Sequence, residues 1–277
     1  MKTVAQGSLR KMCGKLATSV EYGFCVADQA RINLNDYLNQ SICLEYLGGI
    51  HCVQCGRKTS KSFQQGHCFP CMRKINECGN CRLFPERCRV EEGCYPTDDW
   101  AHTQCHADHT VYLANSSNLK VGITREDNPC ARWIDQGAMQ ALPILTTSNR
   151  YQSGLVEVAL KQFVGDKTNW RTMLKQDSVL VDILAEGRRI LSEAEESLQP
   201  IFARYPNEVK YIETPQPIQI NYPVIQYPEK VSSLSLDKTA RVEGTLHGIK
   251  GQYLILDTGV INIRKFSGYN VKLSVCE

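Results

Sequence analysis

The chain has 277 residues and a net charge of only +3, with 42% hydrophobic and 22% charged residues. These values are typical of globular proteins, and the length exceeds what one core usually holds, so we expect two or three modules. No apolar run approaches the ~20 residues that cross a bilayer, and residues 1–10 lack the apolar core of a signal peptide. We therefore expect a cytoplasmic protein without a membrane partner, which excludes the membrane and secreted classes. In a reducing compartment, the 14 cysteines favour bound metal over disulfides wherever they form Cys-x-x-Cys pairs.

Residues 1–50 form the first predicted segment. Short runs of alternating apolar and polar residues lie between glycines, a pattern that predicts antiparallel strands. Cys13, Cys25 and Cys43 occur singly inside these runs. A lone cysteine in an apolar strand is usually a small core residue, so we expect these three to be buried and not to bind metal.

The second segment, residues 51–108, opens with two Cys-x-x-Cys turns. Cys52 and Cys55 form the first turn, Cys68 and Cys71 the second, and twelve residues separate the turns. This spacing brings four thiolates around one ion, which predicts a structural zinc ribbon with no open coordination position. The alternative, a redox-active Cys-x-x-Cys pair, requires a βαβ context that the flanking sequence lacks.

A third Cys-x-x-Cys pair indicates a second zinc knuckle, but its ligands are ambiguous. The candidates in chain order are Cys78, Cys81, Cys88, Cys94, Cys105 and His109. The most local set takes the first four of them. The alternative closes the site with the last two, which would tie the knuckle to the following strand.

The third segment, residues 109–205, begins as a hairpin. Two β-branched runs, residues 110–113 and 119–124, flank an Asn-Ser-Ser-Asn turn. A short helical piece around residues 131–134 follows, and then an amphipathic helix that begins near Ser153. Residues 177–204 predict a further helix that Pro200 kinks or ends.

Prolines mark residues 206–239 as an extended connector, and the last segment is residues 240–277. Four short alternating runs separated by turn residues predict either a small barrel or a sheet completed by the N-terminal strands. The fold class expected for the whole chain is therefore α+β.

The stretch from His109 to Leu174 resembles the GIY-YIG nuclease superfamily, in the branch whose second motif carries lysine. Thr110-Val111-Tyr112 is similar to the first motif, and Lys120-Val121-Gly122 is similar to the second. Arg132 falls at the superfamily's helix arginine, and Glu157 at its metal-binding glutamate. The chain departs from the usual pattern at Thr110, where glycine is common, and at Lys120, where many relatives have tyrosine.

The chain also resembles a bacterial family of unassigned function that joins zinc knuckles to such a central unit. The phrases VYLANSS, RWIDQGA, DKTNWR and GIKGQYL carry this second resemblance. The first resemblance implies a small mixed sheet with helices in the central segment.

The superfamily resemblance also implies roles in phosphodiester cleavage. Tyr112 would orient or deprotonate the attacking water, and Arg132 would hold the non-bridging phosphate oxygens. Glu157 would bind Mg²⁺, and Lys120 would add a cation near the phosphate. Each residue also has an ordinary structural interpretation, such as core packing for Tyr112 or a helical ion pair for Glu157.

Two tryptophans and an arginine complete the candidate contacts with nucleic acid. Trp133 and Trp170 can stack on an unpaired base, with core packing as the alternative. Asn169-Trp170-Arg171 resembles the closing helix motif of the same branch, and Arg171 is the neighbouring cation.

Three functions remain open from the sequence. The first is a Mg²⁺-dependent nuclease with structural zinc, acting on DNA or RNA. The second is a zinc-containing nucleic-acid-binding protein that does not cut. The third, a zinc-stabilised interaction scaffold, stays open because the basic patch in the cysteine-rich segment is modest. Residues 51–90 hold eight basic and two acidic side chains, an excess of six positive charges. Two four-thiolate zinc sites would reduce that excess to about +2.

Overall fold

The computed structural model describes residues 1–78, 80–95, 97–164, 169–175 and 179–276. Three features of the sequence analysis lie outside these ranges. They are Gly79 in the third Cys-x-x-Cys pair, the first three residues of DKTNWR and the expected helix start at residue 177. Within them the chain is α+β, and its strands form three antiparallel sheets. None of the helices in these ranges is long and apolar enough to span a bilayer.

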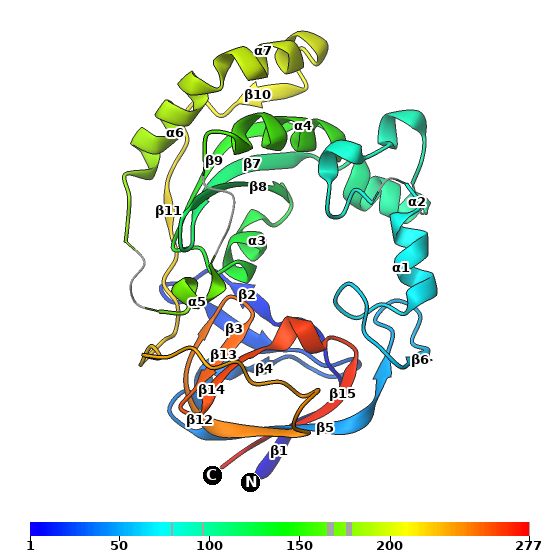
Figure 1. Cartoon of the computed structure of the whole chain (residues 1–277), viewed down its shortest axis with the longest axis vertical. Coiled ribbons are helices and arrows are strands. Elements are labelled where there is room, and N and C mark those ends of the chain that lie inside the picture. Colours follow the sequence, from blue (N-terminus) through cyan, green and yellow to red (C-terminus); the bar gives the residue numbers. More distant parts are fainter. Residues whose placement is uncertain (79, 96, 165–168, 176–178, 277) are drawn as a thin grey trace.

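The two ends of the chain build the largest sheet. Its strands are β1 (Lys2–Ser8), β5 (Ser41–His51), β6 (Lys58–Thr59), β12 (Arg241–Lys250), β13 (Tyr253–Leu256), β14 (Gly259–Asn262) and β15 (Tyr269–Val275). The order is β1-β15-β5-β12-β13-β14, with β6 paired to β5, and Lys2 lies opposite Val275. Both termini therefore meet at one end of the molecule (Figure 1). The tail is a sheet completed by N-terminal strands, which was the second of the two predicted arrangements.

A small sheet of β2 (Cys13–Lys15), β3 (Glu21–Phe24) and β4 (Ile32–Asn33) packs beside this terminal sheet. Tyr22 and Phe24 are fully buried in the core that the two sheets share. Apolar residues that alternate along short strands build this core, as the sequence pattern of the two terminal segments predicted.

The central sheet contains the predicted hairpin. β7 (His109–Asn115) and β8 (Leu119–Arg125) pair antiparallel, and β9 (Gln140–Thr147) lies on the other side of β7. β10 (Val209–Tyr211) and β11 (Ile218–Gln219) also pair with β9, so the proline-rich connector contributes strands to this sheet. Every described pairing here is antiparallel, which corrects the mixed sheet that the resemblance implied.

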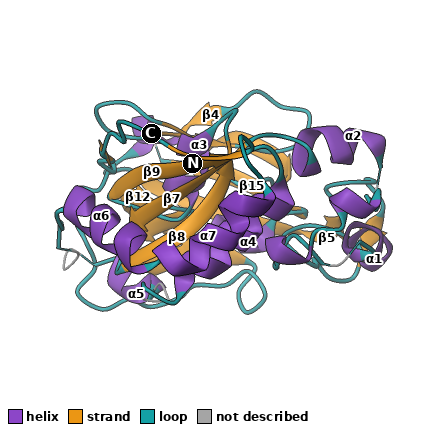
Figure 2. Ribbon diagram, turned by 90° about the horizontal axis from the view of Figure 1, so that it is seen from above, coloured by secondary structure: helices purple, strands orange, loops and turns teal. Residues whose placement is uncertain are grey.

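Helices cover one face of the central sheet, and the terminal sheets lie toward the other. α4 (Arg150–Lys161), α6 (Ile183–Glu193) and α7 (Glu195–Arg204) share an apolar core with Val111 and Leu113 of β7. Figure 2 shows these helices lying over the strands. α3 (Pro129–Asp135) lies on the opposite face, where Tyr112 and Trp133 belong to the core of the terminal sheets. Successive strand residues point to opposite faces, and both faces of β7 are covered. β7 is therefore buried along its whole length.

The helix predicted over residues 177–204 is two helices. The chain breaks at Ala194, between α6 and α7, and Pro200 lies inside α7 without ending it. α5 (Trp170–Met173) is a single turn that packs against β13 and β14 through Met173 and Leu174.

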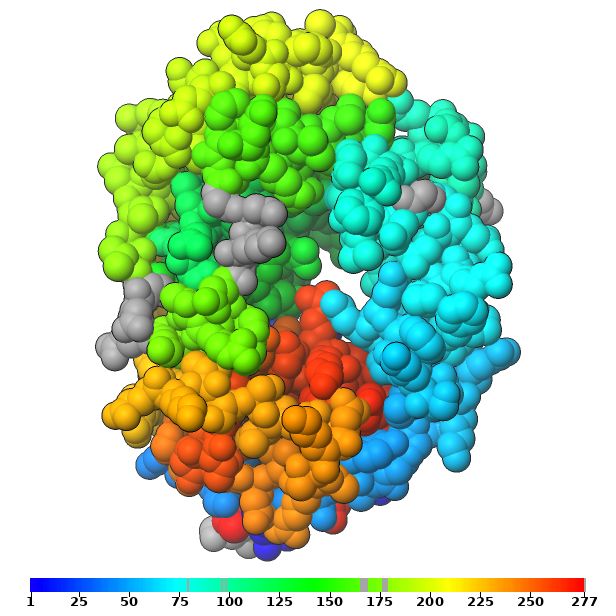
Figure 3. Space-filling view, viewed as in Figure 1, coloured from blue at the N-terminus to red at the C-terminus, as the bar shows by residue number. Residues whose placement is uncertain are grey.

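The cysteine-rich segment runs along one side of the molecule and connects the terminal sheet to the central unit. Its helices are α1 (Phe69–Asn76) and α2 (Asp98–Trp100), which continues as a π-helical turn to Cys105. In the space-filling view, a hollow opens between this segment, the central unit and the C-terminal strands (Figure 3).

Candidate functional site

Four thiols form the group that can hold a metal ion. The ligand atoms of Cys52, Cys55, Cys68 and Cys71 all lie within 4.8 Å of one another. The sulfurs of Cys55 and Cys68 are 3.8 Å apart. A tetrahedral zinc site with Zn–S bonds near 2.3 Å has sulfur–sulfur edges of roughly 3.8 Å, so the arrangement fits zinc.

Local backbone geometry holds these thiols in place. Burial opposes ionisation of Cys52, but backbone hydrogen bonds from Cys68, Cys55 and Gln54 outweigh it and lower its pKa to about 6. Gly66 has a φ of +117°, and a Cβ there would collide with the side chain of Val53, so glycine is needed where the loop returns to the first turn. Cys52 thus favours the thiolate form that a metal requires, whereas burial and the neighbouring thiols raise the pKa of Cys71 to about 12.

The two ligand sets expected for a second zinc site do not form. Cys78 and Cys94 are joined as a disulfide, which removes both from the most local set. The remaining thiols, Cys81, Cys88 and Cys105, are buried together, but their sulfur atoms do not all lie within 4.8 Å of one another. Across the described ranges, the cluster of residues 52–71 is the only such group.

His109, the other expected ligand, is fully buried at the start of β7. Its Nδ1 lies 2.6 Å from the carbonyl oxygen of Ala107, and its Nε2 has no hydrogen-bond partner in the described part of the chain. Burial lowers the pKa of His109 to about 4, so the ring is neutral at physiological pH.

A cleft of about 630 Å³ opens along β8, which is the edge strand of the central sheet. Parts of the chain that are distant in sequence line it: residues 11–14, five residues of the cysteine-rich segment, α3, α4 and Arg264. The five are Arg82, Leu83, Pro85, Trp100 and Gln104. Its charged lining has seven basic and three acidic side chains, an excess of four positive charges. The members are Lys11, Arg82, Arg125, Arg132, Arg150, Lys161, Arg264, Asp127, Asp135 and Glu157. Such an excess in a concave site attracts polyanions.

Tyr112 lies behind the floor of this cleft. It is directly opposite Gly122 in the β7–β8 pairing, and a Cβ on Gly122 would lie 2.7 Å from the Tyr112 hydroxyl. The glycine therefore lets the phenol cross β8, where its hydroxyl donates to Gln136 Oε1 at 3.3 Å. Burial raises the pKa of Tyr112 to about 12, while the nearby Arg132 partly offsets the increase.

Arg132 and Lys120 bring two cations to this region. Arg132 is exposed on α3 and lines the cleft. Burial and then the positive charge of Arg132 lower the pKa of Lys120 to about 8.

Glu157 approaches the same cleft from α4. Asn149 caps this helix by accepting a hydrogen bond from the Gln152 N–H at 2.9 Å. Glu157 is only 9% exposed, and its carboxylate lies 3.4 Å from Lys161 Nζ. Burial raises the pKa of Glu157, against the attraction of Lys161 and Arg132. Tyr112, Lys120, Arg132 and Glu157, singled out by the resemblance, thus lie around one edge of the sheet.

The cysteine-rich segment is held against α4 by close backbone contact. A Cβ on Gly154 would collide with the backbone at Pro85 and Glu86, so only glycine permits this approach. Arg150 also donates two hydrogen bonds to the carbonyl oxygen of Cys81, at 3.0 and 3.2 Å. These contacts form the wall of the cleft that faces β8.

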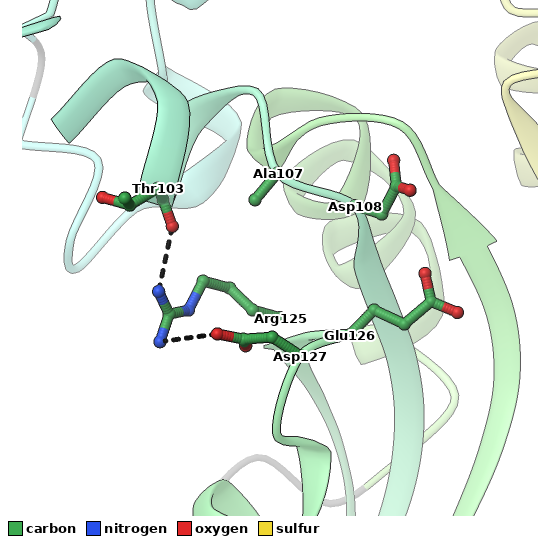
Figure 4. A pocket seen from close by; sticks show the side chains of 6 residues that line it. All are labelled: Thr103, Ala107, Asp108, Arg125, Glu126 and Asp127. Carbon is green, nitrogen blue, oxygen red and sulfur yellow. Dashed lines mark hydrogen bonds and ion pairs between the residues drawn. The ribbon is translucent and has the colours of Figure 1, made fainter. Parts of the chain in front are cut away.

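Arg125, at the end of β8, ties the next turn of the cysteine-rich segment to the sheet. Its guanidinium donates to the Thr103 carbonyl oxygen at 2.9 Å and lies 3.5 Å from the Asp127 carboxylate (Figure 4). This cation therefore already has partners inside the protein.

Several cleft residues were not predicted. Arg150 and Lys161 lie seven residues before and four residues after Glu157, so helical spacing alone could have placed all three on one face. Arg82, whose guanidinium lies 5.6 Å from the Trp100 ring centre, and Arg264 carry no comparable signal. Only the tertiary fold brings these two to the cleft.

The tryptophans do not lie where base stacking requires them. Trp133 is 1% exposed and packs edge-to-face on Tyr112 in the core, so its expected contact with nucleic acid is corrected. Trp170 stacks on Tyr253 with ring centres 5.5 Å apart, and Arg171 lies over the Trp170 ring. Neither Trp170 nor Arg171 lines the cleft.

Residues 39–271 match the profile of a family described as proteins of unknown function, DUF2797. The chain belongs to this family. The matched range includes the four-cysteine cluster, β7, β8 and α4, whereas Lys11 and Cys13 on the rim of the cleft precede it. No curated protein and no solved structure matches the chain.

Proposed function

We propose that this DUF2797 protein acts on nucleic acid as a metal-dependent phosphodiesterase centred on the β8 cleft. The observation that carries the proposal is that Arg132 and Glu157 line one basic cleft, while Tyr112 lies buried directly behind it, against Gly122. The resemblance of residues 109–174 to the GIY-YIG superfamily supports the same assignment. Fold resemblance alone would not suffice, because function depends on the site.

Phosphate binding is the first task of such a site. The exposed guanidinium of Arg132 offers a planar fork that matches two phosphate oxygens. The surrounding excess of four positive charges favours a polyanionic substrate. Lys120 adds a further cation near Arg132 at neutral pH, since its pKa of about 8 keeps most of it protonated.

Glu157 is the residue that would hold Mg²⁺. Magnesium in proteins commonly takes one or two carboxylates and completes its shell with water and substrate phosphate, so a single carboxylate fits. When bound, the ion would supply positive charge to oxygens that become more anionic during cleavage. Lys161 neutralises the Glu157 carboxylate at 3.4 Å and would move aside for the ion.

Tyr112 is protonated at neutral pH like an ordinary tyrosine, and burial raises its pKa further, to about 12. Its hydroxyl donates to Gln136 and does not act as the general base, so Tyr112 would act through Gln136, which lines the cleft. The four-thiol cluster has no open coordination position when it holds zinc, so we assign it to stabilising the segment that forms the opposite wall.

A second candidate function is binding without cleavage. The specific observation in its favour is that Tyr112 is fully buried, while Lys120 occupies the position where the superfamily usually carries a second tyrosine. A cleft with Arg132 and Lys120 but no accessible phenol would bind phosphate without activating water.

Incubation of labelled single-stranded and duplex DNA and RNA with Mg²⁺ tests these functions. Wild type and Glu229→Gln, an exposed carboxylate outside the cleft lining, should cut equally, and Glu157→Gln should lose at least 100-fold in rate. Salt-sensitive binding without any product would favour the second function. If the protein neither binds nor cuts any of these nucleic acids, both functions are contradicted and the interaction scaffold remains.

A further inference from the structure

Cys13 and Cys25 form a pair of thiols outside the metal cluster. Cys13 is exposed and Cys25 is half-buried, yet their sulfur atoms lie 3.0 Å apart. Cys43 is 1% exposed and buried as predicted, so the sequence interpretation of lone core cysteines is right for Cys43 and wrong for the other two.

The β2–β3 pairing explains how the sulfurs meet. Cys13 lies directly opposite Gly23, and Cys25 follows two residues later on the same face of the strand. The antiparallel register therefore places Cys13 and Cys25 as a diagonal pair, close enough for their sulfurs to meet. The Cys25 sulfur also contacts the Gly23 carbonyl oxygen at 3.5 Å.

Positive charge gathers beside the pair. The Arg31 side chain covers Gly23, where an added Cβ would collide with it. The hydrogen bond from Cys25, with smaller contributions from Lys11 and Arg31, lowers the pKa of Cys13 to about 6, whereas the same contact raises the pKa of Cys25. Lys11 itself is held by Asp135 at 2.7 Å.

We propose that Cys13 and Cys25 are a redox-active dithiol that reacts with small-molecule disulfides of the glutathione type. Cys13 is the attacking thiol and Cys25 the resolving thiol. The sulfurs need to close from 3.0 Å to the ~2.05 Å of a disulfide, a movement that side-chain rotation can supply. Cys13 also lines the β8 cleft, so the oxidised bond would form on its rim.

The reaction balances in two steps. The Cys13 thiolate attacks one sulfur of glutathione disulfide, that S–S bond breaks, and one glutathione leaves as a thiolate that takes up a proton. Cys25 then loses its proton to solvent, and its sulfur attacks the Cys13 sulfur of the mixed disulfide, which releases the second glutathione. Two protein thiols are oxidised to one disulfide, and one glutathione disulfide is reduced to two thiols.

Equilibration of the zinc-loaded full chain in glutathione buffers of increasing oxidation tests the proposal. After acid quenching and alkylation, peptide mass spectrometry should find Cys13 linked to Cys25, with a loss of two hydrogen atoms. Cys25→Ser lacks the resolving thiol and should accumulate one glutathione on Cys13. Cys276→Ser, which removes an exposed cysteine elsewhere, should behave as wild type.

Metal content measured on the same samples separates this chemistry from oxidation of the four-thiol cluster. The proposal is overturned if Cys13 and Cys25 are still free thiols, and so become alkylated, at every glutathione ratio. It is also overturned if Cys13 forms a disulfide with another cysteine. It is also overturned if the Cys25→Ser protein carries no glutathione on Cys13. None of these outcomes depends on whether the protein cuts nucleic acid.

Discussion

Gly122 and Tyr112 are in close contact at the candidate site. The hydroxyl and the Cζ atom of Tyr112 lie where a Cβ on Gly122 would be only 2.7 and 2.8 Å away. The position of the phenol therefore depends on the absence of a side chain at residue 122. The sequence motif Lys-Val-Gly identified this glycine, but only the strand register places it under Tyr112.

Gly122→Ala should destabilise the protein by about 1–3 kcal/mol, because the new methyl group overpacks against a buried ring. Urea denaturation measures this cost, and Tyr112→Leu provides the matched background. In that background the cost of Gly122→Ala should fall by at least 1 kcal/mol, as expected for a coupled pair. An equal cost in both backgrounds would show that the ring does not occupy this space.

If the cleft binds nucleic acid as proposed, Lys120 should make that binding depend on pH. An amine is charged below its pKa, so a pKa of about 8 means that Lys120 loses its charge as the pH rises from 7 to 9. We expect oligonucleotide affinity, measured by fluorescence anisotropy at constant ionic strength, to fall several-fold over this range. Lys120→Arg keeps its charge and should remove most of the fall. A similar fall in both proteins would assign the effect to another group.

Trp133 illustrates the limit of residue-level interpretation. The sequence places it beside Arg132 in a short helix, and that spacing does not decide which of the two faces solvent. In the structure Trp133 is 1% exposed while Arg132 is exposed. Trp133 is the buried one of the two because the terminal sheets pack against its side of α3. No local sequence pattern predicts that packing.

Among the elements, the four-cysteine segment was predicted most fully. Two Cys-x-x-Cys turns constrain four sulfurs strongly enough that spacing alone identifies the group. For the second site the spacing left two ligand sets open, and in the structure Cys78 is paired with Cys94 instead. The hairpin and α4 were predicted from periodicity, whereas the break at Ala194 was missed because the apolar pattern continues through it.

Metal removal should unfold the four-cysteine segment while the sheets remain folded. α1 buries only Ile75, so this segment has little apolar core of its own. Hydrogen exchange over residues 51–76 should rise at least tenfold on chelation or in Cys68→Ser, with exchange in β7 unchanged. Wild type and Cys276→Ser should each hold one zinc per chain by mass spectrometry of the metal. Full metal loss with unaltered exchange would show that the segment does not depend on the ion.

At the scale of the whole molecule, the cleft exists because distant segments meet. Asp135 at the end of α3 binds Lys11 at 2.7 Å and lies 3.7 Å from Arg264, which joins the terminal sheets to the helix that carries Arg132. Gln252 also donates to Asp135 at 2.8 Å. Such pairings across more than a hundred residues produce no local sequence pattern. The resemblance therefore singled out Arg132 and Glu157, but no sequence signal pointed to the walls of the cleft.

The same assembly explains why net charge was uninformative. A chain of +3 carries an excess of four positive charges on this one cleft, so its remaining surface is close to neutral. Electrostatic attraction is therefore local, and binding should depend on individual cleft cations.

The most direct test is a salt titration of oligonucleotide binding, by fluorescence anisotropy without Mg²⁺, for wild type and Arg132→Ala. Arg188→Ala on the exposed face of α6 is the matched control. We predict that Arg132→Ala weakens binding several-fold and reduces the slope of log affinity against log salt by about one, while Arg188→Ala changes neither. Unchanged affinity and slope in Arg132→Ala would contradict nucleic-acid recognition by the β8 cleft.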